Sequence, residues 1–188
     1  VSEKPWKDLL EVINQEKRAI KAMFDLNQAD PPRLSGMEML TASWSRSFSS
    51  DKGEMIANLN NLVDEVQSQP SNGKSKAPRV LLTGCPVGLG TEKVIRLTED
   101  LGAHIVAMEN CSGYKTLELQ ADTAGSDPIV ALAEKYLAIP CSCMSPNPYR
   151  LELLARMMAD FRADAVIDLT WQACHTYNIE AHDVGKLV

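Results

Sequence analysis

The stretch Arg79-Val-Leu-Leu-Thr-Gly-Cys-Pro-Val-Gly-Leu-Gly90 begins with a short apolar run and continues directly into a glycine-rich turn. A helical pattern follows from Thr91 to about Leu101, and a second apolar run extends from His104 to Met108. Strand, turn, helix and strand in this order are typical of parallel strands joined by right-handed crossovers. The stretch therefore predicts a parallel β-sheet.

The residues after this unit repeat the alternation of helix and strand. Residues 127–137 and 147–161 each begin with a helix-capping residue followed by proline, a common start of a helix. The apolar run Ala165–Leu169 is the last clear strand, and we expect no terminal helix in Asp183–Val188. The predicted fold class is α/β, a parallel sheet flanked by helices in a flavodoxin- or Rossmann-like three-layer arrangement.

The first third of the chain has the pattern of helices that precede the sheet. Apolar residues recur every three or four positions in residues 6–26. Capping-box spacings, Ser35 with Glu38 and Asp51 with Glu54, predict two further helices. The polar stretch after them, rich in Pro, Gly and Ser, indicates a linker. We therefore predict a helical segment at 1–68, a linker at 69–78 and a cysteine-bearing α/β domain at 79–188 that lacks its last strands.

The composition narrows the classes of function. The chain has 188 residues, 45% of them hydrophobic, and a formal net charge of −6, which argues against nucleic acid or an anionic membrane as the partner. No apolar run reaches the roughly 18 residues that span a bilayer, and the N-terminus shows no signal-peptide pattern. Five cysteines without an export signal indicate a reducing compartment, so we expect a cytoplasmic protein. Because the chain opens on Val1, we also expect a processed or partial product.

The cysteines carry the strongest functional signal. Cys85, Cys111, Cys141 or Cys143, and Cys174 follow successive predicted strands, at steps of 26, 30 (to Cys141) and 31 residues (from Cys143). Because the carboxyl ends of parallel strands share one edge, we expect these thiols to converge there, together with the starts of the helices at residues 91, 128 and 148. The plainer alternative is that each cysteine is a small buried hydrophobe.

The Cys141-Ser142-Cys143 stretch brings two thiols close together in the sequence. An extended backbone, which Pro140 favours, would point both thiols toward one site, whereas a turn would leave one of them to pack. A structural zinc site usually has two close ligand pairs, and this spacing matches neither a thioredoxin nor a small ferredoxin. Thiolates that converge from several strands are better suited to an iron–sulfur cluster.

Other side chains are weaker candidates. Glu109, beside Cys111, could act as an acid or base, and helix capping explains it equally well. His175, next to Cys174, could relay a proton or support a ligand, but a hydrogen bond to the backbone is at least as good an account. The turn Gly84–Gly90 lacks the G-x-G-x-x-G order and the Lys-Ser or Lys-Thr pair of a P-loop, so a tight turn is favoured over nucleotide binding.

Three longer strings are specific enough to indicate a family. They are LLTGCPVGLGTEKVIRLTEDLGAHIVAMENCSGYKT (81–116), IPCSCMSPNPYR (139–150) and VIDLTWQACHTYNIE (166–180). In these strings the chain resembles the 2-hydroxyacyl-CoA dehydratase / benzoyl-CoA reductase superfamily, which includes the 2-hydroxyglutaryl-CoA dehydratase D-component, and most closely its double-cubane-cluster branch. The resemblance is strong from Arg79 onward and extends to the helical segment as the piece that joins two similar α/β domains.

The resemblance implies oxygen-sensitive iron–sulfur clusters, either 4Fe-4S or double-cubane 8Fe-9S, that serve ATP-driven one-electron reduction at low potential. A separate ATP-hydrolysing activator would deliver the electron for acyl-CoA dehydration or reduction of another small substrate. Cys174 matches the C-terminal ligand of the dehydratase cubane. Cys85, Cys111 and Cys143 (or Cys141) would fit the second cubane of the double-cubane type. The resemblance also implies a dimer, of unlike subunits in dehydratases and of like subunits in the double-cubane branch.

We expect two departures from the family pattern, and one of them is that the last strands of the second domain are cut off. The N-terminal α/β domain and its cysteines are absent, so the chain corresponds to about half of a family member. Two other functions stay open at this stage. One is a non-catalytic interaction or electron-relay domain with structural cysteines, and the other is a nucleotide-binding enzyme that uses the Gly84–Gly90 turn.

Overall fold

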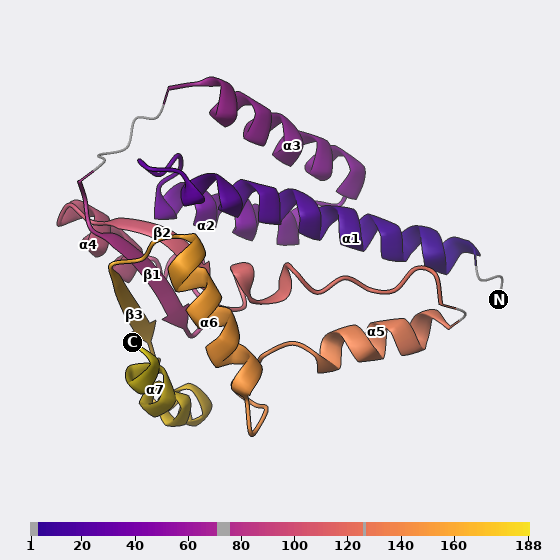
Figure 1. Ribbon diagram of the computed structural model, residues 1–188. Helices are drawn as coiled ribbons and strands as arrows, with labels where there is room; N and C mark the ends of the chain where they lie inside the picture. The colour runs from indigo at the N-terminus through magenta and orange to yellow at the C-terminus, as the bar shows by residue number, and fades with distance from the viewer. Residues whose placement is uncertain (1–3, 71–75, 126) are drawn as a thin grey trace.

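The computed structural model describes residues 4–70, 76–125 and 127–188. Within these residues a three-stranded parallel sheet is flanked by helices, and a helical segment precedes it (Figure 1), which confirms the predicted α/β class. The strands are β1 (Arg79–Gly84), β2 (His104–Glu109) and β3 (Ala165–Leu169). The helices are α1 (Lys4–Asp25), α2 (Gly36–Ser45), α3 (Lys52–Ser68), α4 (Lys93–Asp100), α5 (Pro128–Leu137), α6 (Pro148–Asp160) and α7 (His175–Leu187). Short 3-10 helices are η1 (Leu26–Gln28), η2 (Arg46–Phe48) and η3 (Tyr114–Thr116).

The central strand of the sheet is β1, in the order β2-β1-β3. All of its residues are buried, as expected for an apolar strand covered on both faces. Near the carboxyl end of the sheet, Thr83 of β1 lies in register between Glu109 of β2 and Asp168 of β3. A row of polar side chains therefore crosses the sheet just before its strands end.

The predicted helix starts in the first third of the chain are confirmed. Ser35 and Glu38 form a capping box, in which each side chain accepts a hydrogen bond from the backbone N–H of the other. Asp51 caps α3 by accepting a hydrogen bond from the backbone N–H of Glu54. These local signals depend on neighbouring residues alone, which explains why the sequence reveals them.

One hydrophobic core joins the helical segment to the sheet. Phe24 of α1, Met39 of α2, Leu81 of β1 and Ile105 of β2 are all fully buried in it. Helices α1 and α3 pack side by side (Figure 1). Residues 71–75 of the predicted linker lie outside the described residues, and the division of the chain into domains stays a prediction.

The segment between α5 and α6 is not a strand, so the prediction that Cys141 or Cys143 follows one is wrong. The N–H of Cys141 donates to the carbonyl of Ile139 (2.7 Å), and the N–H of Met144 donates to the carbonyl of Cys141 (2.9 Å). These contacts form tight turns. The physical reason is the local composition, because prolines and small polar residues surround the cysteines and no apolar run is available to pair with the sheet.

Helix α5 also differs from its predicted position. It packs against α1, with Ala131 and Leu10 in a small apolar cluster of their own. The helix begins at its end far from the sheet (Figure 1), and the expectation that α5 starts at the cysteine edge is wrong. The cause is the missing strand after α5, because a crossover helix covers a sheet only when its chain returns to that sheet.

The last segment of the chain is helical, contrary to expectation. Helix α7 includes residues 183–187 and packs against α6. Its buried residues, Tyr177 and Val184, lie seven positions apart on one face, and packing of such a face supplies most of the stability of a helix. Among the residues that the structure describes, no helix combines the length and the apolar character required to cross a bilayer.

Replacing Leu82 by alanine should lower the free energy of unfolding by about 2–5 kcal/mol, because the side chain is fully buried in the central strand and its removal leaves a cavity. Urea unfolding followed by circular dichroism measures the change. The matched control is Leu101→Ala, where the side chain is 80% exposed and the expected change is below about 0.5 kcal/mol. Equal effects of the two substitutions would contradict the central position of β1.

Candidate functional site

All five cysteines are free thiols. Cys85 follows β1, Cys111 follows β2, and Cys174 follows β3 as the residue before α7, while Cys141 and Cys143 lie in the turns before α6. We call these five residues the cysteine edge. The structure places three of them at the carboxyl ends of the strands, as the sequence predicts, and two of them on a separate loop.

Cys85 and Cys174 form the first group of thiols. Cys85 is 1% exposed, and its Sγ accepts a hydrogen bond from the backbone N–H of Trp171 (3.3 Å). Burial raises the pKa of the Cys85 thiol, which also donates to Cys174. Hydrogen bonds from the backbone N–H of Tyr177, from the hydroxyl of Thr176 and from Cys85 lower the pKa of Cys174. The pair therefore combines a protonated thiol with one that ionises more readily.

The backbone at Gly84 allows Cys85 to reach this position. Gly84 has a φ of +101°, and a Cβ there would lie 2.2 Å from the carbonyl oxygen of Leu169. The same carbonyl accepts a hydrogen bond from the N–H of Cys85 (2.7 Å). Glycine is therefore required where β1 ends against β3.

Cys111, Cys141 and Cys143 form the second group. Burial alone would raise the pKa of Cys141, but hydrogen bonds from the backbone and thiol of Cys143, with the charge of Lys115, lower it overall. The thiol of Cys143 has a raised pKa because of its hydrogen bond to Cys141 and the charge of Cys141, with a smaller contribution from Cys111. This group repeats the combination of one thiol that ionises readily and a protonated neighbour.

A buried ionic network lies next to this group. Glu109 is completely buried, with Lys115 Nζ 3.2 Å from its Oε1 and Arg150 Nε 3.3 Å from its Oε2. Burial raises the pKa of Glu109, and the two cations oppose that rise. Arg150 also donates to Thr83 Oγ1 (3.0 Å) and forms an ion pair with Glu180 of α7. The network joins β1, β2, η3, α6 and α7.

Asp168 is the third member of the polar row that crosses the sheet. In the described part of the chain, no cation forms an ion pair with its carboxylate. Both of its carboxylate oxygens are buried, and they have no hydrogen-bond partner among the described residues. Burial raises the pKa of Asp168, while Arg150 and Lys115 act in the opposite direction from a distance. This side chain is the clearest unpaired acid beside the cysteine edge.

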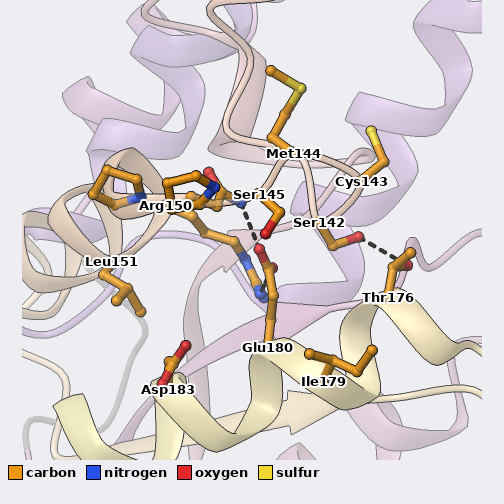
Figure 2. Close-up of a pocket in the computed structure, with 13 residues that line it drawn as sticks. Ser142, Cys143, Met144, Ser145, Arg150, Leu151, Thr176, Ile179, Glu180 and Asp183 are labelled. Carbon is orange, nitrogen blue, oxygen red and sulfur yellow. Dashed lines mark hydrogen bonds and ion pairs between the residues drawn. The ribbon is translucent and has the colours of Figure 1, made fainter.

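A cavity of about 580 Å³ opens between the cysteine loop and α7 (Figure 2). The hydroxyl of Ser142 donates to that of Thr176 (3.2 Å), and Glu180 extends from α7 toward Arg150. Cys143 also lines this cavity. A small molecule in the cavity would therefore lie against Cys143 of the second thiol group.

The structure places the weaker candidates, Glu109, His175 and the glycine-rich turn, in three different environments. Glu109 does not cap a helix, because its carboxylate is bound by the cations of the buried network. His175 is exposed at the start of α7. In the glycine-rich turn, a Cβ on Gly88 would lie 2.5 Å from the ring of Trp44, so this glycine serves close packing. The acid–base roles suggested for Glu109 and His175 stay predictions.

Sequence reasoning missed Lys115, Arg150, Tyr177 and Asp168. A signal was available for Asp168, because each of the three strands carries a polar residue at its last or second-to-last position. No comparable signal identifies Lys115 or Arg150, whose charges resemble those of any exposed loop or helix.

The comparison with known proteins settles the family. The sequence profile described as "2-hydroxyglutaryl-CoA dehydratase, D-component" matches residues 1–188. The chain belongs to the 2-hydroxyglutaryl-CoA dehydratase D-component family. It is 40% identical over 190 aligned positions to a protein of Escherichia coli (strain K12) named "Putative dehydratase subunit YjiM". That alignment covers 100% of this chain and 49% of YjiM, so the chain spans about half the length of this relative.

The chemistry of the cysteine edge fits a thiolate-held iron–sulfur cluster. Within the described residues, no group of three or more His, Cys, Asp or Glu side chains is placed to hold a single metal ion. A cluster of several irons is wider than one ion and takes its thiolates from separate points around it. Free thiols in two groups, three at the sheet edge and two on the loop before α6, with N–H and O–H donors to sulfur at Cys85 and Cys174, suit such a cluster in a D-component family member.

Replacing Arg150 by methionine should lower the free energy of unfolding by about 3–5 kcal/mol, because it leaves buried Glu109 with one cation fewer and removes the ion pair with Glu180. The matched control on the same helix is Arg156→Met, whose exposed ion pair with Glu118 contributes about 1 kcal/mol or less. Urea unfolding measures both. A small effect of Arg150→Met would contradict the network.

Replacing Asp168 by asparagine should stabilise the protein at pH 7 and have little effect near pH 3. The pKa of an aspartate in the unfolded chain is about 3.9. Burial raises the pKa of Asp168 in the folded protein above its ordinary value. As the pH rises between these two values, the unfolded chain loses its proton first, so stability falls. Urea unfolding from pH 3 to 7 measures the difference, with exposed Asp100→Asn as the control. No gain for Asp168→Asn at pH 7 would contradict the buried, unpaired state of this acid.

Proposed function

We propose that this chain is the iron–sulfur component of a 2-hydroxyacyl-CoA dehydratase-type enzyme that performs ATP-driven, low-potential one-electron reduction of a small substrate. The observation that carries the proposal is the cysteine edge of a D-component family member, where five free thiols form two groups. Each group contains a thiol of lowered pKa, Cys174 in one and Cys141 in the other. Thiolates are the form in which cysteine binds iron.

We assign the ligands by these groups. Cys85 and Cys174 bind on the β1–β3 side, and Cys111 binds with Cys143 or Cys141 on the β2–α6 side. When bound, a 4Fe-4S or double-cubane 8Fe-9S cluster supplies single electrons at low potential. The chain contributes thiolates, a backbone N–H aimed at Cys85, and the N-terminus of α7, where Cys174 lies and the helix dipole favours negative charge.

The cavity beside Cys143 is the site that we propose for a small substrate. Its walls combine apolar side chains such as Met144 and Ile179 with the hydroxyls of Ser142 and Thr176. An acyl-CoA thioester presents a similar mixture of apolar chain and carbonyl oxygen. Its place beside the thiol group would shorten the path of an electron to the substrate.

The proposed partners follow from the family. An ATP-hydrolysing activator supplies the electron, and the working unit is a dimer, in line with the relative that is named a dehydratase subunit. Nucleic acid and membrane are not proposed partners, and the proposed location is the cytoplasm. The chain covers 49% of the length of this relative, and we propose that the complete cleft includes further protein.

A second candidate is a non-catalytic electron-relay or interaction domain with structural cysteines. The observation in its favour is the burial of Cys85, which is 1% exposed and behaves as part of the core. Iron binding separates the two candidates, because structural thiols would hold no iron.

Cys85→Ser and Cys111→Ser should each lower bound iron and sulfide while the fold persists, because serine keeps the size of cysteine and removes the thiolate. Iron and acid-labile sulfide per chain are measured on full-length protein purified without oxygen. About eight irons would indicate a double cubane and about four a single one. The control is Ser142→Ala, which lies between two cysteines and should keep full iron. Absence of iron in the wild type would overturn the proposal, as would full retention in both cysteine variants.

A further inference from the structure

Basic side chains from four elements gather beside the middle of α1, apart from the cysteine edge. They are Lys17 of α1, Arg46 of η2, Lys52 of α3 and Lys135 of α5, which we call the basic cluster. The acid among them is Glu16 of α1, whose Oε1 lies 3.3 Å from Lys52 Nζ and 4.0 Å from Arg46 Nη1. Four cations therefore share one carboxylate, in a chain whose formal net charge is −6.

Two members of the basic cluster are buried and keep their hydrogen-bond donors unused. Lys135 is 4% exposed, and its Nζ has no hydrogen-bond partner in the part of the chain that the structure describes. The ring of Tyr136, 5.5 Å from this Nζ, offers only a weak cation–π contact. The side chain of Arg46 is 17% exposed, and its 4.0 Å contact with Glu16 is too long for a hydrogen bond. An ammonium has three N–H donors and a guanidinium has five, so the cluster can serve further acceptor atoms.

The charges of the basic cluster destabilise one another. Burial and the charges of Lys135 and Arg46 lower the pKa of Lys17 to about 8. Burial also lowers the pKa of Lys135 and of Arg46, and Glu16 acts in the opposite direction on all three. Buried charges are stable when they are paired and hydrogen-bonded. An anion that contacts the cluster would therefore be bound with a gain in stability.

The number of free donors and the excess of positive charge indicate the kind of anion. A phosphate group has several acceptor oxygens and more than one negative charge, and Lys and Arg are its usual protein ligands. The side chains of Arg46 and Lys52 are 17% and 38% exposed, so the cluster reaches the surface. The stem of Lys135 is a flexible chain of four carbons, which allows its ammonium to turn toward an anion beside Arg46.

We propose that the basic cluster is a binding site for a phosphate group, carried either by the free ion or by a small phosphorylated molecule. Lys17 contributes as well, because the carbonyl of Thr116 takes only one of its three donors (2.6 Å). The cluster has no side chain in common with the cysteine edge or with the cavity beside Cys143. The site therefore goes beyond the proposed function and does not depend on iron.

The test measures binding of inorganic phosphate to the full-length protein by isothermal titration calorimetry, with ionic strength held constant by sodium chloride. We expect saturable binding to the wild type. Lys135→Met and Arg46→Gln should each weaken it at least tenfold, because each removes a cation that has free donors. The matched control is Arg18→Gln, next to Lys17 on α1, whose ion pair with Glu11 is exposed. This variant should keep the affinity of the wild type.

Thermal unfolding separates loss of the site from loss of the fold. A ligand that binds the folded state raises Tm, so phosphate should raise the Tm of the wild type and of Arg18→Gln more than chloride of equal ionic strength does. Phosphate should not raise the Tm of Lys135→Met. Without phosphate, Lys135→Met should unfold at the temperature of the wild type or above it, because methionine removes an unpaired buried charge and keeps the length of the stem.

Phenyl phosphate distinguishes the two sources of the phosphate group, because it carries the same group on a bulky ring. If phenyl phosphate binds as well as inorganic phosphate and both are weakened in Lys135→Met, the ligand is a phosphorylated small molecule. If inorganic phosphate alone binds, the ligand is the free ion. Absence of saturable binding of either compound to the wild type overturns the proposal, as does unchanged affinity in both Lys135→Met and Arg46→Gln.

Discussion

The buried carboxylate of Glu109 is the constraint on which the rest of this structure depends. An isolated charge in a protein interior is strongly disfavoured, and two cations with several hydrogen bonds are needed to keep it there. Those cations come from different elements, Lys115 from η3, six residues after Glu109, and Arg150 from α6. Through Arg150 the same carboxylate is linked to Thr83 of β1 and Glu180 of α7. Satisfying one side chain therefore fixes the relative positions of five elements.

The buried network also helps to fix the positions of the cysteines. Cys111 lies two residues beyond Glu109, the Cys141–Cys143 loop ends a few residues before Arg150, and Cys174 lies at the start of the helix that carries Glu180. Each thiol-bearing segment is thus attached to a member of the network by a short piece of backbone. A site that must hold thiolates in fixed positions benefits from such support, because loops alone would leave the sulfurs free to move.

The sequence was informative where structure is local. The strands β1 and β3, the capping box at Ser35 and the helix start at Pro128 each depend on a few adjacent residues, and they were predicted correctly. The loop at Cys141 was mistaken for an extended segment after a strand, because the regular spacing of the cysteines suggested a further βα unit. The network was missed for a different reason. Which buried acid meets which base is decided by the packing of α6 and α7 on the sheet, and periodicity carries no information about such pairs.

The buried network contains more acids than bases. Three acids, Glu109, Glu180 and Asp168, face two bases, Lys115 and Arg150, and Asp168 has no contact partner among the described residues. Burial raises the pKa of Asp168, because water no longer stabilises its charged form. The ammonium of Lys115 contacts Glu109 and also donates to the hydroxyl of Tyr177, which lies 3.9 Å from Cys111 Sγ. The network therefore extends from the sheet to the cysteine edge through Tyr177.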